Sequence, residues 1–365
     1  MTRARIVADD LTGALDAAAP FAAPGSPLPV LWSREVAAAR SGSFALDTES
    51  REGATLGRLE DALPLLAGAE VALKKIDSLL RGNTLAEIGL CLESRRFASV
   101  VVAPAFPAQQ RITQGGRQLW RKAGSDPWQP VAADLRLDGV SHAAKPGEIE
   151  GEGEGAFLCD AGSEADLDAI VAAARRLAPP LLWVGTAGLA RALAGAPRSL
   201  PQDELPRPLL VVIGSHHPVT LAQVETLAEV RPQAVVRLGL DEDPDSALAR
   251  IRQMLREEGA AALILTVPDG TGAHVAAPVF DRAFARAATL LPPPASLIVS
   301  GGATLHRLVQ VLDARALLCE GEIFPGIAGS TLEGGRWNGA RVVSKSGGFG
   351  SAEVLTRLIG AGEGS

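Results

Sequence analysis

Short apolar runs alternate with longer stretches of helical spacing along most of the chain. The apolar runs are rich in Val, Ile and Leu and lack polar alternation, which is typical of parallel strands buried on both faces. They lie at Ile6–Ala8, Val30–Trp32, Phe44–Leu46, Val71–Leu73, Val100–Val102, Phe157–Cys159, Leu181–Val184, Leu210–Ile213, Val235–Leu238, Leu263–Val267, Leu297–Val299 and Val342–Val343. The helical stretches between them include Leu56–Leu66, Leu85–Phe97, Ala165–Leu177, Leu221–Val230 and Ala247–Glu257. This alternation predicts βαβ units, and hence an α/β fold of mostly parallel sheets flanked by helices.

The clearest interruption of this pattern is a proline-rich stretch, Gly195–Pro208. Its four prolines prevent any regular element. The chain of 365 residues is long enough for two domains of about 100–200 residues each. We therefore predict two domains, residues 1–200 and 207–365. A second irregular stretch, the acidic and glycine-rich Lys145–Gly155, is interpreted as a surface loop because strand and helix patterns resume after it.

Composition and charge exclude several classes of protein. The net charge is −7, from 35 Lys and Arg against 42 Asp and Glu, which argues against a nucleic-acid-binding surface. No apolar run approaches the roughly 20 residues of a membrane span, and the N-terminus has no signal-peptide core. The cysteines Cys91, Cys159 and Cys319 lie far apart, so neither a disulfide scaffold nor a zinc module is expected. We expect a soluble cytoplasmic protein without nucleic-acid or membrane partners.

Ligands of open α/β sheets bind beyond the carboxyl ends of the strands, so the residues that follow each strand carry the functional information. The first strand ends at Asp9-Asp10, shortly before Thr12. Two adjacent carboxylates can grip sugar hydroxyls, hold a cation or take a proton from a hydroxyl. Alternatively, Asp10 or Thr12 caps the first helix. Two acids in tandem are more than one cap requires, so both interpretations stay open.

The strand near Val71–Leu73 runs into a mixture of cations and small polar residues, among them Lys74, Lys75, Asp77 and Arg81. Such groups at a strand end make an anion pocket, and an arginine can hold a carboxylate through two parallel hydrogen bonds. A solvated turn with incidental charges is the alternative interpretation.

Three strands of the second half precede turns rich in glycine and serine. The turns are Gly214-Ser215-His216-His217, Ser300-Gly301-Gly302-Ala303-Thr304 and Ser344-Lys345-Ser346-Gly347-Gly348-Phe349-Gly350. Backbone N–H groups in such turns bind phosphate, and glycine lets the backbone approach it closely. One glycine turn is often only a tight connection, but three in one half of the chain indicate a nucleotide site.

Several common motifs are absent from the sequence. There is no GxxxxGK[ST], which excludes a P-loop, and no GxGxxG follows a strand, which removes the dinucleotide fingerprint. GxSxG and HExxH are absent too. The histidines have no metal-ligand spacing, and only the pair His216-His217 lies at a candidate site. We therefore predict no metal site built by the chain itself.

Several blocks of the sequence are long enough to compare with known families. They are IVADDLTGALDAA at the start, ALDTESRE at 45–52, KKIDSLLRGN at 74–83, VVAPAFPAQQR at 101–111, WVGTAGLARAL at 183–193, VVIGSHHPVT at 211–220, VSGGAT at 299–304 and VSKSGGFGSAEVL at 343–355. In these blocks and their order the chain resembles the four-carbon acid sugar kinase family. The resemblance covers essentially the whole chain.

The resemblance implies an ATP-dependent kinase that phosphorylates the terminal hydroxyl of a four-carbon sugar acid, such as erythronate, threonate or an oxo-tetronate. It also implies that the N-terminal domain binds the acid, that the C-terminal domain binds ATP with Mg²⁺, and that the active site lies in the interdomain cleft. By this likeness the acid-binding residues are Asp9, Asp10, Lys74, Asp77 and Arg81. The nucleotide-binding residues are Ser215, Gly301, Gly302, Ala303, Thr304, Gly347 and Gly348.

The chain departs from the family pattern at a few of these positions. Leu79 stands where a threonine is usual, and His216-His217 replaces a more serine-like pair. Ala303 replaces an acidic residue. The change at Ala303 bears on how ATP is held, and Leu79 bears on which acid is used.

For the mechanism, we expect Arg81, with Lys74 or Lys75, to hold the substrate carboxylate while Asp9 and Asp10 hold hydroxyls. Asp10 and Arg81 are the predicted catalytic residues, with Asp10 accepting the proton of the attacking alcohol. Mg²⁺ would bridge the ATP phosphates, and glycine-turn N–H groups would neutralise developing charge. Two other functions stay open: a sensor that binds acid sugars without catalysis, and an isomerase or dehydrogenase on the same scaffold. The stereochemistry of the acid and a homodimeric state are left open as well.

Overall fold

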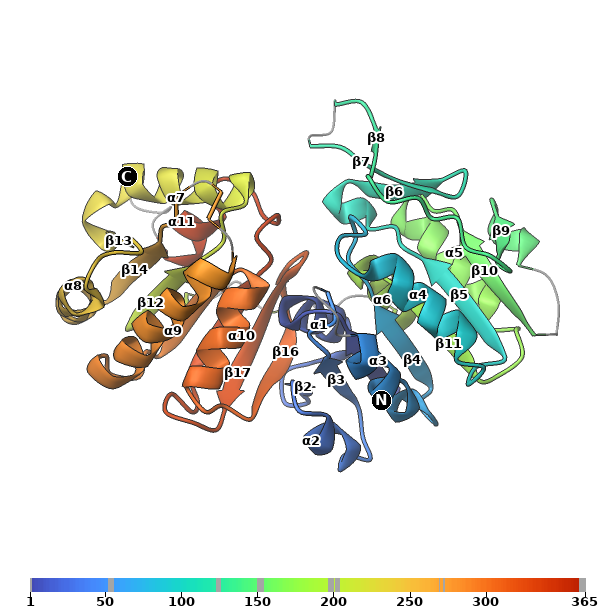
Figure 1. The fold of residues 1–365 in the computed structure, drawn as a ribbon, viewed down its shortest axis with the longest axis horizontal. Helices are drawn as coiled ribbons and strands as arrows, with labels where there is room; N and C mark the ends of the chain where they lie inside the picture. Colours follow the sequence, from blue (N-terminus) through green and yellow to red (C-terminus); the bar gives the residue numbers. More distant parts are fainter. Residues whose placement is uncertain are drawn as a thin grey trace. The chain divides into compact units, whose positions relative to one another are not determined.

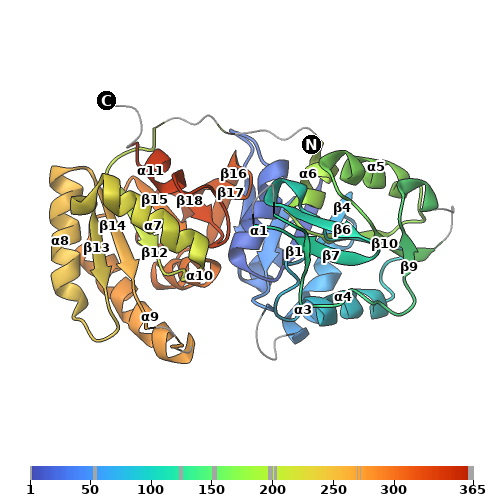
Figure 2. The same ribbon diagram turned by 90° about the horizontal axis from the view of Figure 1, so that it is seen from above.

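Each apolar run predicted as a strand overlaps a strand in the computed structural model, which describes residues 2–51, 56–122, 126–149, 154–195, 200, 204–268, 270–271 and 273–360. The chain divides into two compact units, residues 1–198 and 199–365. Each unit has a mostly parallel sheet with helices on both faces (Figure 1, Figure 2). The predicted α/β fold class is therefore confirmed. Much of the proline-rich stretch, and residues 150–153 of the predicted surface loop, lie outside the described residues.

The sheet of the first unit is built from parallel pairs in the order β2-β3-β1-β4-β11-β5-β10-β9. Its strands are β1 (Ala4–Ala8), β2 (Leu28–Leu31), β3 (Phe44–Asp47), β4 (Val71–Lys75), β5 (Ser99–Ala103), β9 (Ser141–Ala143), β10 (Gly155–Cys159) and β11 (Leu181–Gly185). Every residue of the central strands β4 and β5 is buried, as expected where helices cover both faces of a sheet.

Several helices of the first unit begin at polar residues that cap them. The helices are α1 (Leu11–Ala18), α2 (Arg34–Ala38), α3 (Leu56–Ala62), α4 (Thr84–Glu93), α5 (Glu164–Ala174) and α6 (Ala187–Ala194), with short 3-10 turns η1 (Ala19–Phe21), η2 (Leu63–Leu66), η3 (Pro107–Gln109) and η4 (Pro146–Glu148). Asp10, Ser163 and Thr186 cap α1, α5 and α6 by accepting an N–H of the first turn. Helices α5 and α6 cover one face of the sheet and α3 and α4 the other (Figure 2).

A small antiparallel sheet follows β5 in the chain and lies at the carboxyl edge of the larger one (Figure 1). Its strands are β6 (Arg111–Gln114), β7 (Arg117–Trp120) and β8 (Gln129–Pro130). The Gln118 side chain in β7 donates to the carbonyls of Ser78 and Pro104, both at 3.0 Å. These bonds attach the small sheet to the loops that follow β4 and β5.

The sheet of the second unit has the order β13-β14-β12-β15-β18-β17-β16. Its strands are β12 (Leu209–Ile213), β13 (Val235–Leu238), β14 (Ala260–Leu265), β15 (Ser296–Ser300), β16 (Ala316–Phe324), β17 (Ile327–Glu333) and β18 (Arg341–Lys345). The first five strands of this order pair in parallel, whereas β17 is antiparallel to both β18 and β16. Strands β16 and β17 were not predicted from the apolar pattern.

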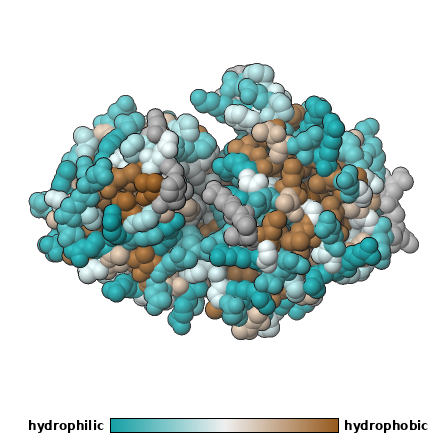
Figure 3. Space-filling model, in the orientation of Figure 1, coloured by the Kyte–Doolittle hydropathy of each residue, from teal (hydrophilic) through white to brown (hydrophobic). Residues whose placement is uncertain are grey.

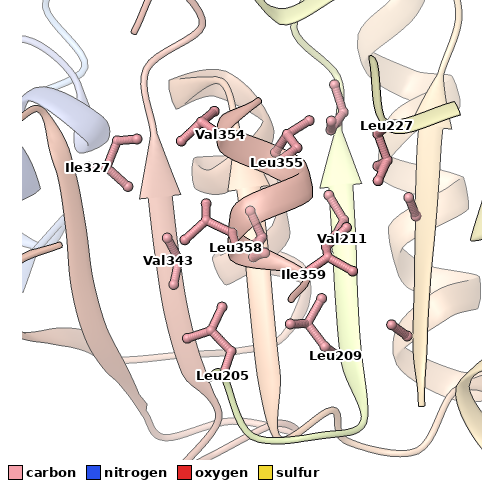
Figure 4. Packing of buried hydrophobic residues seen from close by; sticks show 14 of the residues in the cluster. Leu205, Leu209, Val211, Leu227, Ile327, Val343, Val354, Leu355, Leu358 and Ile359 are labelled. Atoms are coloured by element: carbon pink, nitrogen blue, oxygen red, sulfur yellow. The ribbon is translucent and has the colours of Figure 1, made fainter. Parts of the chain in front are cut away.

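Helices pack on both faces of this second sheet (Figure 2). They are α7 (Pro218–Val230), α8 (Pro244–Glu257), α9 (Ala273–Leu290), α10 (Gly302–Val311) and α11 (Val354–Leu358), with the 3-10 turn η5 (Pro232–Ala234). Figure 4 shows the core beneath α11, where Leu355 and Leu358 lie against the strand residues Val211 and Val343. The short helix α11 is thus fixed by apolar packing, directly after the last glycine turn.

Apolar side chains are largely removed from water in both units. On the face shown in Figure 3, hydrophilic residues dominate the rim, and apolar residues gather toward the middle of each unit. Among the residues with described side chains, the exposed large hydrophobic ones are Val36, Leu221, Val230 and Val275. No helix in the described ranges is long and apolar enough to span a bilayer.

Candidate active site

Three neighbouring strands of the first unit end at the same level. In the parallel pairing of β1 with β3 and with β4, Ala8 lies opposite Asp47 and opposite Lys75. The segments that follow these strands therefore emerge side by side at the carboxyl edge of the sheet. They carry Asp9 and Asp10 after β1, Arg51 after β3, and Asp77 and Arg81 after β4. We call these five residues the charged cluster.

Arg51 holds three carboxylates of the charged cluster together. Its Nε donates to Asp9 Oδ2 at 2.7 Å, and its terminal nitrogens donate to the two Asp10 oxygens at 2.9 and 2.7 Å. A terminal nitrogen also lies 3.7 Å from Asp77 Oδ1. The Arg51 side chain is only 20% exposed, so this guanidinium is an internal counter-ion.

The two acids after β1 have different surroundings. Asp10 Oδ1 accepts the Gly13 N–H at 2.9 Å and Oδ2 accepts the Thr12 hydroxyl at 2.8 Å, so Asp10 does cap α1. The Asp10 side chain is 17% exposed, whereas that of Asp9 is closed off completely. Asp9 Oδ1 is buried without a hydrogen-bond partner among the described residues. Of the pair, Asp10 is the carboxylate that a ligand can reach.

Asp77 organises the loop after β4 and anchors Arg81. Its Oδ2 accepts the N–H groups of Leu79 and Arg81, both at 3.1 Å. The Arg81 side chain donates back to both Asp77 oxygens, at 2.9 and 2.6 Å. Asp77 is buried, but the Arg81 side chain is 51% exposed. This guanidinium is therefore fixed in orientation and still accessible, which suits recognition of a carboxylate.

Two glycines permit this close packing. A Cβ at Gly13 would overlap Asp10 Oδ1 and would lie 3.0 Å from Lys75 Nζ. A Cβ at Gly82, where φ is +65°, would overlap the Arg51 carbonyl oxygen. Only glycine fits at either position, so the sequence blocks around both residues have a local structural reason.

Lys74 and Lys75 point to opposite faces of β4, as successive strand residues do. The Lys75 ammonium lies beside Gly13, next to the charged cluster. Lys74 is fully buried, and its ammonium pairs with Glu87 Oε2 at 3.0 Å. Glu87 in turn accepts a hydrogen bond from Ser50. The structure thus gives Lys74 a buried carboxylate partner, whereas the Lys75 ammonium lies next to the charged cluster. The predicted contact of Lys74 with the acid stays a prediction.

A third guanidinium, Arg111 at the start of β6, is close enough to act on the charged cluster. Burial lowers the pKa of Arg111 to about 10, and the charges of Asp77 and Arg81 act on it in opposite directions. Because β6 belongs to the small sheet attached at the ends of β4 and β5, Arg111 brings further positive charge to this edge.

The cations keep the buried acids ionised. Burial by itself raises the pKa of Asp9, but the charges of Arg51 and Lys75 bring it below its ordinary value. Burial acts on Asp77 in the same way, and there the hydrogen bond from Arg81 and the charge of Arg51 lower the pKa. The acids in return raise the pKa of Arg51 well above its ordinary value despite burial.

Three neighbouring strands of the second unit also end at the same level. In the parallel pairing of β15 with β12 and with β18, Ser300 lies opposite Ile213 and opposite Lys345. The turns that follow therefore converge at one edge of the sheet. We call residues 214–217, 301–304 and 346–350 the three glycine turns.

Ser215 lies where the glycine turns meet. A Cβ at Gly347 would overlap Ser215 Oγ, and one at Gly301 would lie 3.3 Å from Ser215 Cβ. Thr304 is buried, and its Oγ1 would overlap a Cβ placed at Gly214. Ala303 is exposed beside it on the first turn of α10. The structure therefore brings the predicted nucleotide residues of all three turns together.

His216 and His217 have different surroundings. His217 is the N-cap of α7, because its Nδ1 accepts the Val219 N–H at 3.2 Å. Its Nε2 would lie 3.3 Å from a Cβ placed at Gly348, so the ring faces the third glycine turn. His216 is exposed. His217 thus performs the capping that a serine performs at many helix starts.

The described part of the chain contains no group of three or more His, Cys, Asp or Glu side chains that could hold a metal ion.

Comparison with protein families matches the two units separately. A family described as a sugar-binding N-terminal domain matches residues 4–143, and one described as a nucleotide-binding C-terminal domain matches residues 210–355. The D-threonate kinase of Cupriavidus necator is 33% identical over an alignment that covers 96% of this chain and 95% of that protein. The chain belongs to the four-carbon acid sugar kinase family.

Other members of the four-carbon acid sugar kinase family are named for two different acids. A D-threonate kinase of Bordetella bronchiseptica is 29% identical, over 98% of this chain and 96% of that protein. A D-erythronate kinase of Heliobacterium modesticaldum is 24% identical, over 98% and 97%. A solved structure from Salmonella typhimurium LT2 covers 98% of both chains with a TM-score of 0.71 at 19% identity, which supports the fold.

The charged cluster lies in the segment that the family describes as sugar-binding, and the glycine turns lie in the segment described as nucleotide-binding. Sequence reasoning did not single out Arg51, although it is part of the block ALDTESRE. A single arginine in that block does not by itself indicate a site. Only the register of β1, β3 and β4 places it between the acids. Lys75 could have been separated from Lys74 by the two-residue period of a strand.

Proposed function

We propose that the chain is an ATP-dependent kinase that transfers a phosphoryl group to the terminal hydroxyl of a four-carbon sugar acid, giving the 4-phosphate. The acid would be erythronate, threonate or an oxo-tetronate. The proposal rests on one observation. Charged side chains gather in the segment that matches the sugar-binding family, and the glycine turns gather in the segment that matches the nucleotide-binding family. The kinase names of the relatives support the reaction class.

In this proposal Arg81 holds the carboxylate of the acid. Its guanidinium is fixed by Asp77 and is half-exposed, so a ligand carboxylate can meet it without breaking an internal ion pair. Lys75 and Arg111 add positive charge near the same strand ends. A charge-assisted hydrogen bond of this kind contributes about 1.5–3 kcal/mol.

Asp10 accepts the proton of the attacking terminal hydroxyl in this proposal. Its contact with the α1 N-terminus and its two hydrogen bonds from Arg51 fix its orientation. A carboxylate held in a fixed orientation suits this role, because phosphoryl transfer depends mainly on positioning and charge neutralisation. Asp9 is closed off and serves instead as the second carboxylate that holds Arg51.

The phosphates of ATP would be held by backbone N–H groups of Gly302, Gly347 and Gly348 and by the Ser215 hydroxyl. Gly301 would contribute to the shape of its turn, because its N–H donates to the Lys345 carbonyl at 3.0 Å. The position of Ser215 between the other two turns fits this role. Thr304 shapes the first turn from its buried position, and Ala303 offers only its backbone. Mg²⁺ brought by ATP would supply charge neutralisation.

Acid-dependent release of ADP tests this function. The protein is incubated with ATP, Mg²⁺ and each of a panel of four-carbon acids, with a no-acid sample and a five-carbon acid as controls, and the product is mapped by ³¹P NMR. We expect ADP release with at least one four-carbon acid and phosphate on its terminal oxygen. Binding of an acid without ADP release would identify a sensor, and a product without phosphate would identify a different enzyme.

A further inference from the structure

Lys345 is a fully buried lysine at the end of β18, directly before the third glycine turn. Its ammonium donates to the Ser346 carbonyl at 3.0 Å, to the Phe349 carbonyl at 3.1 Å and to the Thr220 hydroxyl at 3.3 Å. Among the described residues no carboxylate forms an ion pair with it, in contrast to Lys74, whose partner is Glu87. Burial accordingly lowers the pKa of Lys345 to about 7.

Side chains beneath the third glycine turn bind its carbonyl groups. The Thr220 hydroxyl donates to the Gly347 carbonyl at 2.7 Å. Gln223 Nε2 donates to the carbonyls of Phe349, Gly350 and Ser351, at 3.0, 3.1 and 2.9 Å. Thr220 and Gln223 are both completely buried on α7. Together with Lys345, they draw the carbonyl oxygens of the turn into the interior of the unit.

The direction of these carbonyls determines the direction of the N–H groups. In a trans peptide the C=O of one residue and the N–H of the next point in opposite directions. Carbonyls of Ser346, Gly347 and Phe349 that face inward therefore turn the N–H groups of Gly347, Gly348 and Gly350 outward. Successive outward N–H groups form the concave arrangement that binds anions.

We propose that Lys345 is a positioning residue of the nucleotide site, which holds the third glycine turn from inside so that its N–H groups face the phosphates of the bound nucleotide. Lys345 acts without touching the nucleotide. This inference rests on the proposed function and extends it from the turn to the buried residue that shapes it.

The charge of Lys345 defines the ligand class. A buried charge without an opposite charge is costly, and an anion across the turn removes part of that cost. Attraction between charges is stronger in the interior of a protein than in water. The buried ammonium therefore attracts an anion that binds on the other side of the turn. A phosphate chain gains from this attraction, whereas an uncharged nucleoside does not.

Four variants separate this role from general stability. Lys345→Met removes the hydrogen bonds and the charge, and Lys345→Gln keeps donors for the carbonyls without the charge. Thr220→Val removes the hydrogen bonds that the hydroxyl makes with the Gly347 carbonyl and the Lys345 ammonium, at nearly constant shape. Thr220→Ser is its matched control because the hydroxyl is retained. The dissociation constants of ADP, adenosine and the substrate acid are measured by calorimetry, after circular dichroism has shown that each variant is folded.

We expect Lys345→Met to weaken ADP binding about tenfold or more, as for loss of a hydrogen bond to a charged group. Lys345→Gln should weaken it less, Thr220→Val should weaken it several-fold, and Thr220→Ser should bind as the natural protein does. The dissociation constants of adenosine and of the acid should change less than twofold in all four.

Unchanged ADP affinity in folded Lys345→Met, or equal losses for ADP and adenosine, would overturn the proposal. If Lys345→Met does not fold, Thr220→Val decides: ADP affinity equal to that of Thr220→Ser would overturn it. Failure of the proposed function would look different, because the natural protein itself would then not bind ADP.

Discussion

The charged cluster and the glycine turns share one geometry and differ in chemistry. In each unit three neighbouring parallel strands end level, at Ala8, Asp47 and Lys75 in the first and at Ile213, Ser300 and Lys345 in the second. The first edge presents charged side chains, and the second presents backbone. If the proposed function holds, the same kind of sheet edge recognises a small acid through side chains in one unit and a phosphate chain through peptide groups in the other.

The two edges also balance charge differently. In the charged cluster, Arg51 meets Asp9 and Asp10, and Arg81 meets Asp77, so each charge has a partner within the unit. In the second unit Lys345 is buried without a carboxylate partner among the described residues. Loss of the buried Arg51 charge should therefore damage the fold of the first edge, whereas loss of the Lys345 charge should mainly affect ligand binding at the second.

Replacement of Arg51 should have the largest effect. Arg51→Met leaves the buried Asp9 carboxylate without its cation, and breaking a buried pair in this way costs about 3–5 kcal/mol. We expect Arg51→Met to unfold at a lower urea concentration than the natural protein does, and to lose acid-dependent turnover. Arg51→Lys, which keeps the charge but not the fork of donors, is the control and should recover part of the stability. Natural stability in Arg51→Met would show that the cluster does not depend on its central cation.

Replacement of Asp10 should affect turnover more than stability. Asp10→Asn keeps a side-chain oxygen for the Gly13 N–H, because asparagine also caps helices well. It removes the proposed proton acceptor, so kcat should fall by about 10²–10⁴. Steady-state kinetics with KM for ATP unchanged would support the role. Near-natural kcat in this variant would remove Asp10 from the mechanism.

Replacement of Arg81 should act on the acid alone. Arg81→Ala removes one charge-assisted contact of about 1.5–3 kcal/mol, so KM for the acid should rise by about 10- to 100-fold. KM for ATP should stay within twofold, as Arg81 belongs to the sugar-binding segment. KM of Arg81→Lys for the acid should lie between that of the natural protein and that of Arg81→Ala. Equal increases of KM for both substrates would contradict the assignment of this residue to the acid.

The smallest expected effect is a pH dependence of stability that arises from Lys345. Its folded-state pKa of about 7 lies below the ordinary 10.5, so above pH 7 the unfolded chain binds more protons than the folded one. Folding stability should therefore rise by about 1 kcal/mol from pH 7 to pH 8 through this group, and fall as the pH drops through 7. Urea titrations of the natural protein and Lys345→Met measure it. Identical pH slopes in the two proteins would show that Lys345 does not titrate there.

The central strands could be predicted from the sequence because they are buried on both faces. The runs at Val71–Leu73 and Leu210–Ile213 are continuous and apolar, and they are strands in the structure. Strands β16 and β17 escaped prediction because polar residues and glycines interrupt them, Glu320 and Gly321 in one and Gly329 in the other. In the structure, antiparallel pairing satisfies the backbone N–H and C=O groups of both strands. No continuous apolar run in the sequence indicates this pairing.

The candidate site could be predicted only to the level of strand ends. Asp10 and Asp77 were identified because they follow strands, and the turn at Gly347 because of its glycines. Arg51 was not identified, and Lys345 was named only as part of the third turn, since the roles proposed for them depend on which groups surround them. For Arg51 that is a matter of strand register, and for Lys345 it is a matter of burial. Neither property has a local sequence signal.

The central claim is that the charged cluster binds the acid and the three glycine turns bind the nucleotide. Binding of both ligands to two variants, one from each region, tests this claim most directly. Calorimetry would give the dissociation constants of ADP and of the substrate acid for the natural protein, Arg81→Ala and Lys345→Gln. We predict that Arg81→Ala raises only the dissociation constant of the acid, and that Lys345→Gln raises only that of ADP. Weakening of both ligands in either folded variant, or the reverse pairing of variant and ligand, would contradict it.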